Sequence, residues 1–243
     1  MRTMDFFLFG IMPYIALSVL IIGSIARYDR APYTWKASSS QFLRRKQLVW
    51  GSVLFHVGII IVFFGHLVGL LTPTWVFDLM GISYGVKQFL AIVVGGIAGA
   101  MAIVGGAMLI HRRLYDPRIR KQSSFADTGI IMLIWAQLVI GMGTILVSFQ
   151  HLDGGEMVRF MNWSQGVFTF RTDAYLEVVG VHWIYKLHIF VGFIIFILFP
   201  FTRLVHMFSV PVKYFFRPGY QVVRSKKIDA RSAAPGHKVH PAE

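Results

Sequence analysis

The sequence predicts an all-α integral membrane protein, built as a bundle of five transmembrane helices. The 243-residue chain is 56% hydrophobic and has a mean hydropathy of +0.61, which is a membrane composition rather than a soluble one. A helix needs about 20 apolar residues to cross a bilayer core. Five runs meet this requirement: residues 6–26, 48–71, 88–110, 129–149 and 183–206.

Lys and Arg are concentrated in alternate connections between these runs. Residues 27–46 contain six and residues 111–121 contain five, and the chain after Lys213 is also basic. In contrast, residues 72–87 contain one Lys, and residues 150–181 contain two Arg against four acidic residues. Because cytoplasmic loops carry the excess of Lys and Arg, we expect the N-terminus in the periplasm and the C-terminus in the cytoplasm.

This arrangement also accounts for the formal net charge of +13. The charges lie between apolar runs, so they indicate topology and contact with lipid headgroups, not nucleic-acid binding. We expect residues 1–225 to form one membrane domain and residues 226–243 to form a polar cytoplasmic tail. Trp75, Trp163 and Trp183 are expected to lie in an interfacial aromatic belt, although ordinary packing explains any single Trp equally well.

The chain contains no cysteine. This excludes disulfides, thiolate metal sites, iron–sulfur clusters and covalently attached c-type haem within the chain.

Four of the nine histidines lie inside predicted spans: His56 and His66 on the second, His188 and His206 on the fifth. A lone buried histidine is more often a hydrogen-bonding group between helices, but two on each of two helices favour a ligand role. Because the two spans are antiparallel, His56 matches His206 in depth near the cytoplasm, and His66 matches His188 toward the periplasm.

Two bis-histidine pairs in a helical bundle suit two b-type haems. This ligation leaves no open position and favours electron transfer over oxygen chemistry. Zinc is a poorer alternative because these depths offer no acidic or Cys ligands. One mismatch arises: in straight helices the rise is about 15 Å from His56 to His66 and about 27 Å from His188 to His206. Tilt, side-chain reach and a kink at Pro200 are expected to absorb the difference.

Several stretches resemble a known family: "LFHVGIIIVFFGHLVGLLTPTW", "VKQ", "HRRLYDPRIR", "QHLDGGEM", "KLHIFVGF" and "LFPFTRLVHMFSVPVKY". They are similar to the gamma subunit of respiratory nitrate reductase, the di-haem cytochrome b anchor of a molybdenum enzyme complex. The resemblance runs from about residue 12 to residue 224, which is nearly the whole chain.

The resemblance implies a multi-pass protein of the bacterial inner membrane that oxidises quinol near the periplasmic face. Electrons would pass through two haems b to iron–sulfur clusters of a cytoplasmic beta subunit. A molybdenum-bearing alpha subunit would then reduce nitrate to nitrite. On this chain, the resemblance implies His56 and His206 as ligands of the haem nearer the cytoplasm, and His66 and His188 as ligands of the haem nearer the periplasm.

The resemblance also implies that Lys87 and His66 act on quinol, beside Gly65 and Gly69. A lysine could hydrogen-bond a quinone oxygen, whereas the alternative is a Lys whose charged end snorkels to the membrane interface. Arg112, at the cytoplasmic boundary, is a candidate to bind a haem propionate, and a topological anchor is the alternative.

Two other function classes stay open at this point. One is a di-haem cytochrome b subunit of another quinone-linked complex, of the heterodisulfide-reductase or sulfite-reduction type, which co-purifying subunits would distinguish. The other is a haem-free membrane anchor or transporter whose histidines relay protons. A reduced-minus-oxidised optical spectrum separates this last class from both cytochromes.

Overall fold

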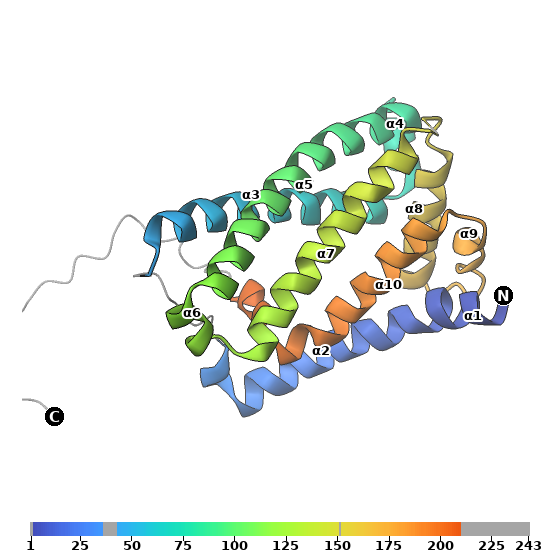
Figure 1. Ribbon diagram of the computed structural model, residues 1–243. Helices are drawn as coiled ribbons and strands as arrows, with labels where there is room; N and C mark the ends of the chain where they lie inside the picture. The colour runs from blue at the N-terminus through green and yellow to red at the C-terminus, as the bar shows by residue number, and fades with distance from the viewer. Residues whose placement is uncertain (1, 36–42, 151, 210–243) are drawn as a thin grey trace, which may run out of the picture. The chain divides into compact units, whose positions relative to one another are not determined.

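The computed structural model describes residues 2–35, 43–150 and 152–209 (Figure 1). Five helical segments within this part are long and apolar enough to cross a membrane, which confirms the predicted fold class. They are Thr3–Arg30, Arg45–Leu71, Tyr84–Tyr115, Phe125–Ser148 and Trp183–Phe201. The compact unit that contains them ends at Phe208, and the polar tail predicted for residues 226–243 lies outside the described residues.

The five segments contain the long helices of Figure 1. The first comprises α1 (Arg2–Phe6), the π-helical η1 (Phe7–Ile11) and α2 (Met12–Arg30); the others are α3 (Arg45–Leu71), α5 (Tyr84–Tyr115), α7 (Phe125–Ser148) and α10 (Trp183–Leu198). Short helices lie in the connections: η2 (Pro32–Thr34), α4 (Thr74–Leu79), α6 (Pro117–Gln122), α8 (Gly155–Phe168) and α9 (Leu176–Val179). The 3₁₀ turns η3 (Phe199–Phe201) and η4 (Arg203–Phe208) follow α10.

Side-chain caps fix where several helices begin. The hydroxyl of Ser83 accepts from the backbone N–H of Val86 at the start of α5, and Asp116 accepts from two backbone N–H groups at the start of α6. Such caps satisfy N–H groups that have no partner inside the helix. Asp116 also pairs with Arg44 at 3.1 Å. Desolvation would raise the pKa of Asp116, but the two backbone hydrogen bonds and the Arg44 charge lower it overall.

The long helices pack in the order α2, α10, α7, α5, α3, and α8 packs against α3 (Figure 1). The contact between α3 and α5 is the most extensive. It depends on glycines, because a Cβ on Gly58 would strike the carbonyl oxygen of Ala98 and lie 2.7 Å from the backbone nitrogen of Ala102. A Cβ on Gly105 would lie 2.7 Å from the carbonyl oxygen of Gly51. Small residues that let backbones approach are a general device of membrane helix pairs.

We therefore expect Gly58→Ala to force α3 away from α5 and to destabilise the protein. Overpacking of this kind typically costs about 1–3 kcal/mol. Gly129→Ala on α7 is the matched control, because a Cβ there has nothing within 4 Å. Thermal midpoints of the detergent-solubilised proteins measure the difference. Equal midpoints for the two variants would contradict the close contact between α3 and α5.

The fifth predicted span, residues 183–206, is too long as a single helix. Helix α10 ends at Leu198, and Thr202 is extended (φ −118°, ψ −179°) before η4 begins. Pro200 explains the break, since proline lacks the N–H that would continue the helix. His206 therefore lies on a separate turn, and the straight-helix rise of about 27 Å does not apply to it.

Helix α2 holds this break in place. Arg27 donates from Nη1 to the carbonyl oxygens of Pro200 (2.8 Å) and Thr202 (2.7 Å). One turn earlier, Gly23 leaves room for the Pro200 ring, because a Cβ there would lie 2.8 Å from Pro200 Cγ. These contacts give hydrogen-bond donors to carbonyls in and directly after η3 and position the turn that carries His206.

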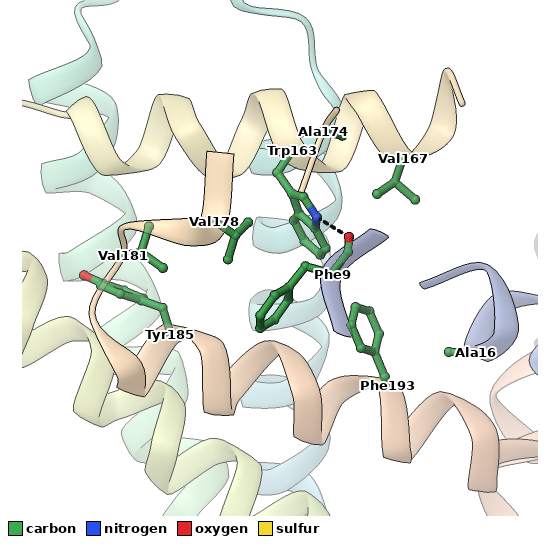
Figure 2. Packing of buried hydrophobic residues seen from close by; sticks show 9 residues of the cluster. All are labelled: Phe9, Ala16, Trp163, Val167, Ala174, Val178, Val181, Tyr185 and Phe193. Atoms are coloured by element: carbon green, nitrogen blue, oxygen red, sulfur yellow. Dashed lines mark hydrogen bonds between the residues drawn. The ribbon is translucent and has the colours of Figure 1, made fainter. Parts of the chain in front are cut away.

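Helix α8 and the N-terminal segment form a buried cluster with α9 and α10 (Figure 2). At its centre the indole Nε1 of Trp163 donates to the carbonyl oxygen of Phe9 at 3.0 Å. Trp163 is only 8% exposed, so its assignment to the aromatic belt is wrong. Its N–H finds a partner inside the protein, whereas Trp75 and Trp183 are exposed as a belt requires.

Candidate functional site

The four intramembrane histidines form two pairs in space. The ring centroids of His56 and His206 are 6.3 Å apart, and those of His66 and His188 are 6.1 Å apart. A metal bound by two opposed imidazoles, at about 2 Å from each nitrogen, separates the ring centroids by about 6 Å. Each pair therefore has the spacing that a shared metal requires. The ligand role itself stays a prediction.

Three of these rings have a defined tautomer. Nδ1 of His56 lies 2.7 Å from the Ser52 carbonyl oxygen, and Nδ1 of His66 lies 2.8 Å from that of Val62. Nδ1 of His206 lies 2.5 Å from the Arg203 carbonyl oxygen. A carbonyl can only accept, so Nδ1 carries the proton in each ring and Nε2 keeps its lone pair. Metal-binding histidines in proteins commonly make this second hydrogen bond.

His188 has a different environment. Its Nδ1 is buried and has no hydrogen-bond partner in the described part of the chain. Its backbone carbonyl accepts from Nε2 of Gln137 at 2.9 Å. Helix α7 makes room for the ring at Gly141, where a Cβ would lie 2.9 Å from His188 Cε1. A buried nitrogen without a partner is costly, and metal coordination is one way to compensate for it.

Gln137, Gly141 and Ser52 support the histidines and were not predicted from the sequence. Signals for the first two were available, since Gln137 is a polar residue and Gly141 a small one within an apolar span. Their pairing with His188 depends on the packing of α7 against α10. Among the described residues no group of three or more His, Cys, Asp or Glu side chains lies close enough to hold a metal, so the donors fit paired axial ligation better than zinc.

Lys87 belongs to the first turn of α5, and its side chain reaches the end of α3, where three partners surround Nζ in a cage. It is 7% exposed, so the snorkelling alternative is wrong. Its Nζ donates to the carbonyl oxygen of Gly69 at 2.9 Å, lies 2.8 Å from Sδ of Met161, and sits 3.7 Å from the ring centroid of Phe77. Phe77 and Met161 were not predicted from the sequence as partners of Lys87.

The Gly69 carbonyl oxygen needs a donor from outside its own helix, and Lys87 supplies it. In a continuing helix it would accept from the residue four positions later, but that residue is Pro73, which has no N–H. The next free carbonyls of α3 are satisfied from α8: Leu70 accepts from Ser164 and Gln165, and Thr72 accepts from Gln165. Lys87 is therefore part of the cap of α3.

The face of α3 beside Lys87 is open. A Cβ on Gly65 or on Gly69 would have nothing within 4 Å. His66 follows Gly65 directly and is exposed on this helix. The structure thus brings Lys87, Gly69 and the His66 segment together, and the two glycines leave space beside them. Their role in quinol binding stays a prediction.

Arg112 is buried near the predicted cytoplasmic end of α5. Its Nη2 donates to the carbonyl oxygen of Leu43 at 2.7 Å and so holds the chain that enters α3. Arg203 makes a comparable link from Nε to Asp127 at 2.9 Å. Binding of a haem propionate by Arg112 stays a prediction.

The fold and the four histidines define the class of this protein. It is a membrane protein with five spanning helices and two histidine pairs at different positions along the bundle. The nitrate reductase gamma subunit family model matches residues 5–226. Respiratory nitrate reductase 1 gamma chain of Escherichia coli (strain K12) is 44% identical over 226 residues, which cover 93% of this chain and 100% of that one. Nitrate reductase gamma chain of Bacillus subtilis (strain 168) is 40% identical over 219 residues, 90% of this chain and 97% of that one. The chain belongs to the nitrate reductase gamma subunit family.

Proposed function

We propose that this chain is the quinol-oxidising, di-haem cytochrome b subunit of a respiratory nitrate reductase in a bacterial inner membrane. The observation that carries the proposal is the pair of imidazole–imidazole distances, 6.3 and 6.1 Å, in a member of this family. The N-terminus would face the periplasm and the C-terminus the cytoplasm, as the distribution of basic residues indicates.

In this proposal His56 and His206 hold the haem nearer the cytoplasm, and His66 and His188 hold the haem nearer the periplasm. When bound, the two haems would supply one-electron transfer, because bis-imidazole ligation leaves the iron no open position. The backbone carbonyls that accept from three of the Nδ1 atoms fix the ring orientations. Gly141 gives the His188 ring its space.

Quinol oxidation releases two protons and two electrons and leaves quinone. Lys87 would donate a hydrogen bond to a quinol oxygen and stabilise negative charge that develops there. Gly65 and Gly69 would leave room for the quinol ring, and His66 would place the reacting oxygen close to the haem that it helps to hold. The protons would leave toward the side on which residues 72–87 and 150–181 lie, which we assign to the periplasm.

The electrons would leave through partner chains on the cytoplasmic side. This chain has no cysteine, so iron–sulfur clusters would belong to a beta subunit and the molybdenum cofactor to an alpha subunit that reduces nitrate to nitrite. The names of the relatives, which are gamma chains of nitrate reductases, support this division. They favour it over a heterodisulfide-reductase or sulfite-reduction complex.

The purified complex is expected to contain two haems b per gamma chain, measured by pyridine haemochrome assay. Double variants test how the ligands pair. His56→Ala with His206→Ala should leave one haem, because both changes fall on one pair, whereas His56→Ala with His188→Ala should leave none. One haem in the second double variant would contradict the pairing. A wild-type spectrum without a b-type alpha band would contradict the proposed function.

A further inference from the structure

All three N–H donors of the Lys87 ammonium group face a partner in this structure. An ammonium group has three N–H donors, and three partners surround Nζ: the Gly69 carbonyl oxygen, Met161 Sδ and the face of the Phe77 ring. A quinol oxygen that accepts from Lys87 must therefore replace one of the three. The partner that a quinol oxygen replaces is expected to be the one whose position is least fixed by hydrogen bonds and packing.

Gly69 and Met161 are the firmly held partners. The Gly69 carbonyl depends on Lys87, because Pro73 cannot supply the N–H that a helix would provide. Met161 is fully buried within the 14-residue helix α8. Displacing either one would expose a free carbonyl or open a closely packed helix.

Phe77 is the weakly held partner. It lies on α4, a six-residue helix that contains no buried residue. The start of α5 holds α4 through Tyr84, whose hydroxyl donates to Asp78 Oδ1 at 2.8 Å. The turn after α4 passes through Gly81, whose φ of +66° suits glycine and whose surroundings are open.

We propose that Phe77 occupies the substrate's place on Lys87, and that a quinol oxygen binds by displacing the Phe77 ring. This inference rests on the proposed function and adds a specificity-determining residue to it. In the absence of quinol, the aromatic face stabilises the buried ammonium. A ligand must offer a hydrogen-bond acceptor strong enough to outcompete this face, which favours a quinol oxygen over an apolar lipid chain.

The test is the kinetics of duroquinol oxidation by the intact complex, with nitrate as acceptor. Phe77→Leu removes the aromatic face but keeps an apolar side chain, so KM for duroquinol should fall while kcat stays near the wild-type value. A cation–π contact of this kind corresponds to about a 2- to 30-fold change in affinity. Phe77→Tyr keeps the face and should leave KM unchanged. Trp75→Leu is the matched control, because it removes an exposed aromatic residue from the same helix.

An unchanged or higher KM in Phe77→Leu, with both haems retained, would overturn the inference and leave the proposed function intact. Absence of duroquinol oxidation by the wild-type complex would instead overturn the proposed function. If Phe77→Leu does not assemble, Tyr84→Phe decides the matter by releasing α4 without touching the cage. A lower KM in Tyr84→Phe supports displacement of Phe77, and an unchanged KM contradicts it.

Discussion

Replacing His66 or His188 with alanine is expected to remove one of the two haems and to lower quinol:nitrate turnover by more than about 100-fold. Loss of a group that merely orients a metal ligand already costs about 10- to 100-fold, and in the proposed pairing the ligand itself would be lost. The two rings come from different helices and lie 6.1 Å apart. The helices packed against α3 and α10 offer no further histidine within residues 6–26, 88–110, 129–149 and 155–168 to replace them.

Haem content and turnover should be measured on the same membranes. The other haem should remain in both variants, because His56 and His206 are separate side chains held by their own carbonyl contacts. His182→Ala is the matched control, since His182 is an exposed histidine that caps the start of α10. Two haems retained in His66→Ala would show that His66 is not a ligand. Loss of haem in His182→Ala would show that haem content reports folding rather than ligation.

Lys87→Ala is expected to lower quinol oxidation by about 10- to 150-fold while both haems stay bound. A hydrogen bond from a charged donor contributes about 1.5–3 kcal/mol, which corresponds to that range in rate. Nitrate reduction with a soluble dye that reduces the partner subunits directly should not change. The comparison separates damage at the quinol site from damage to the whole complex.

Because Lys87 also caps α3, its removal leaves the Gly69 carbonyl without a donor. Lys87→Arg addresses this point, since a guanidinium can still reach a carbonyl but is planar and larger than an ammonium. We expect Lys87→Arg to retain stability and haem but to restore turnover only in part. Near-normal quinol oxidation in Lys87→Ala would exclude Lys87 from the site and limit its role to the helix end.

The membrane spans could be predicted from the sequence because hydropathy depends on composition alone. The pairing of the histidines could also be predicted, and the ring centroids of the two expected pairs lie 6.3 and 6.1 Å apart, while their role as ligands stays a prediction. The end of the fifth span could not be predicted, because the break after Pro200 depends on contacts with Gly23 and Arg27 of another helix. A helical rise calculated along one straight axis cannot describe such a turn.

The cage around Lys87 was also beyond sequence reasoning. Phe77 lies ten residues before Lys87 and Met161 lies 74 residues after Lys87. Neither separation in sequence indicates a contact with the lysine. Gly65 and Gly69 were expected beside Lys87 from the resemblance to the family, and only the structure locates the open side of the helix there. The burial of Trp163 could not be predicted either, because its hydrogen-bond partner is the Phe9 carbonyl oxygen, 154 residues away in the sequence.

Arg27 combines a positive charge at the predicted cytoplasmic boundary with hydrogen bonds that hold the break after α10. Arg27 is the first residue of the basic connection from which the topology is predicted. It also donates to the carbonyl oxygens of Pro200 and Thr202 and to Thr34. Lysine would preserve the charge on which the predicted orientation depends, but its single ammonium could not span these acceptors. One side chain thus supplies both a charge and a set of directed hydrogen bonds, so guanidinium shape, as well as charge, is expected to constrain substitution at this position.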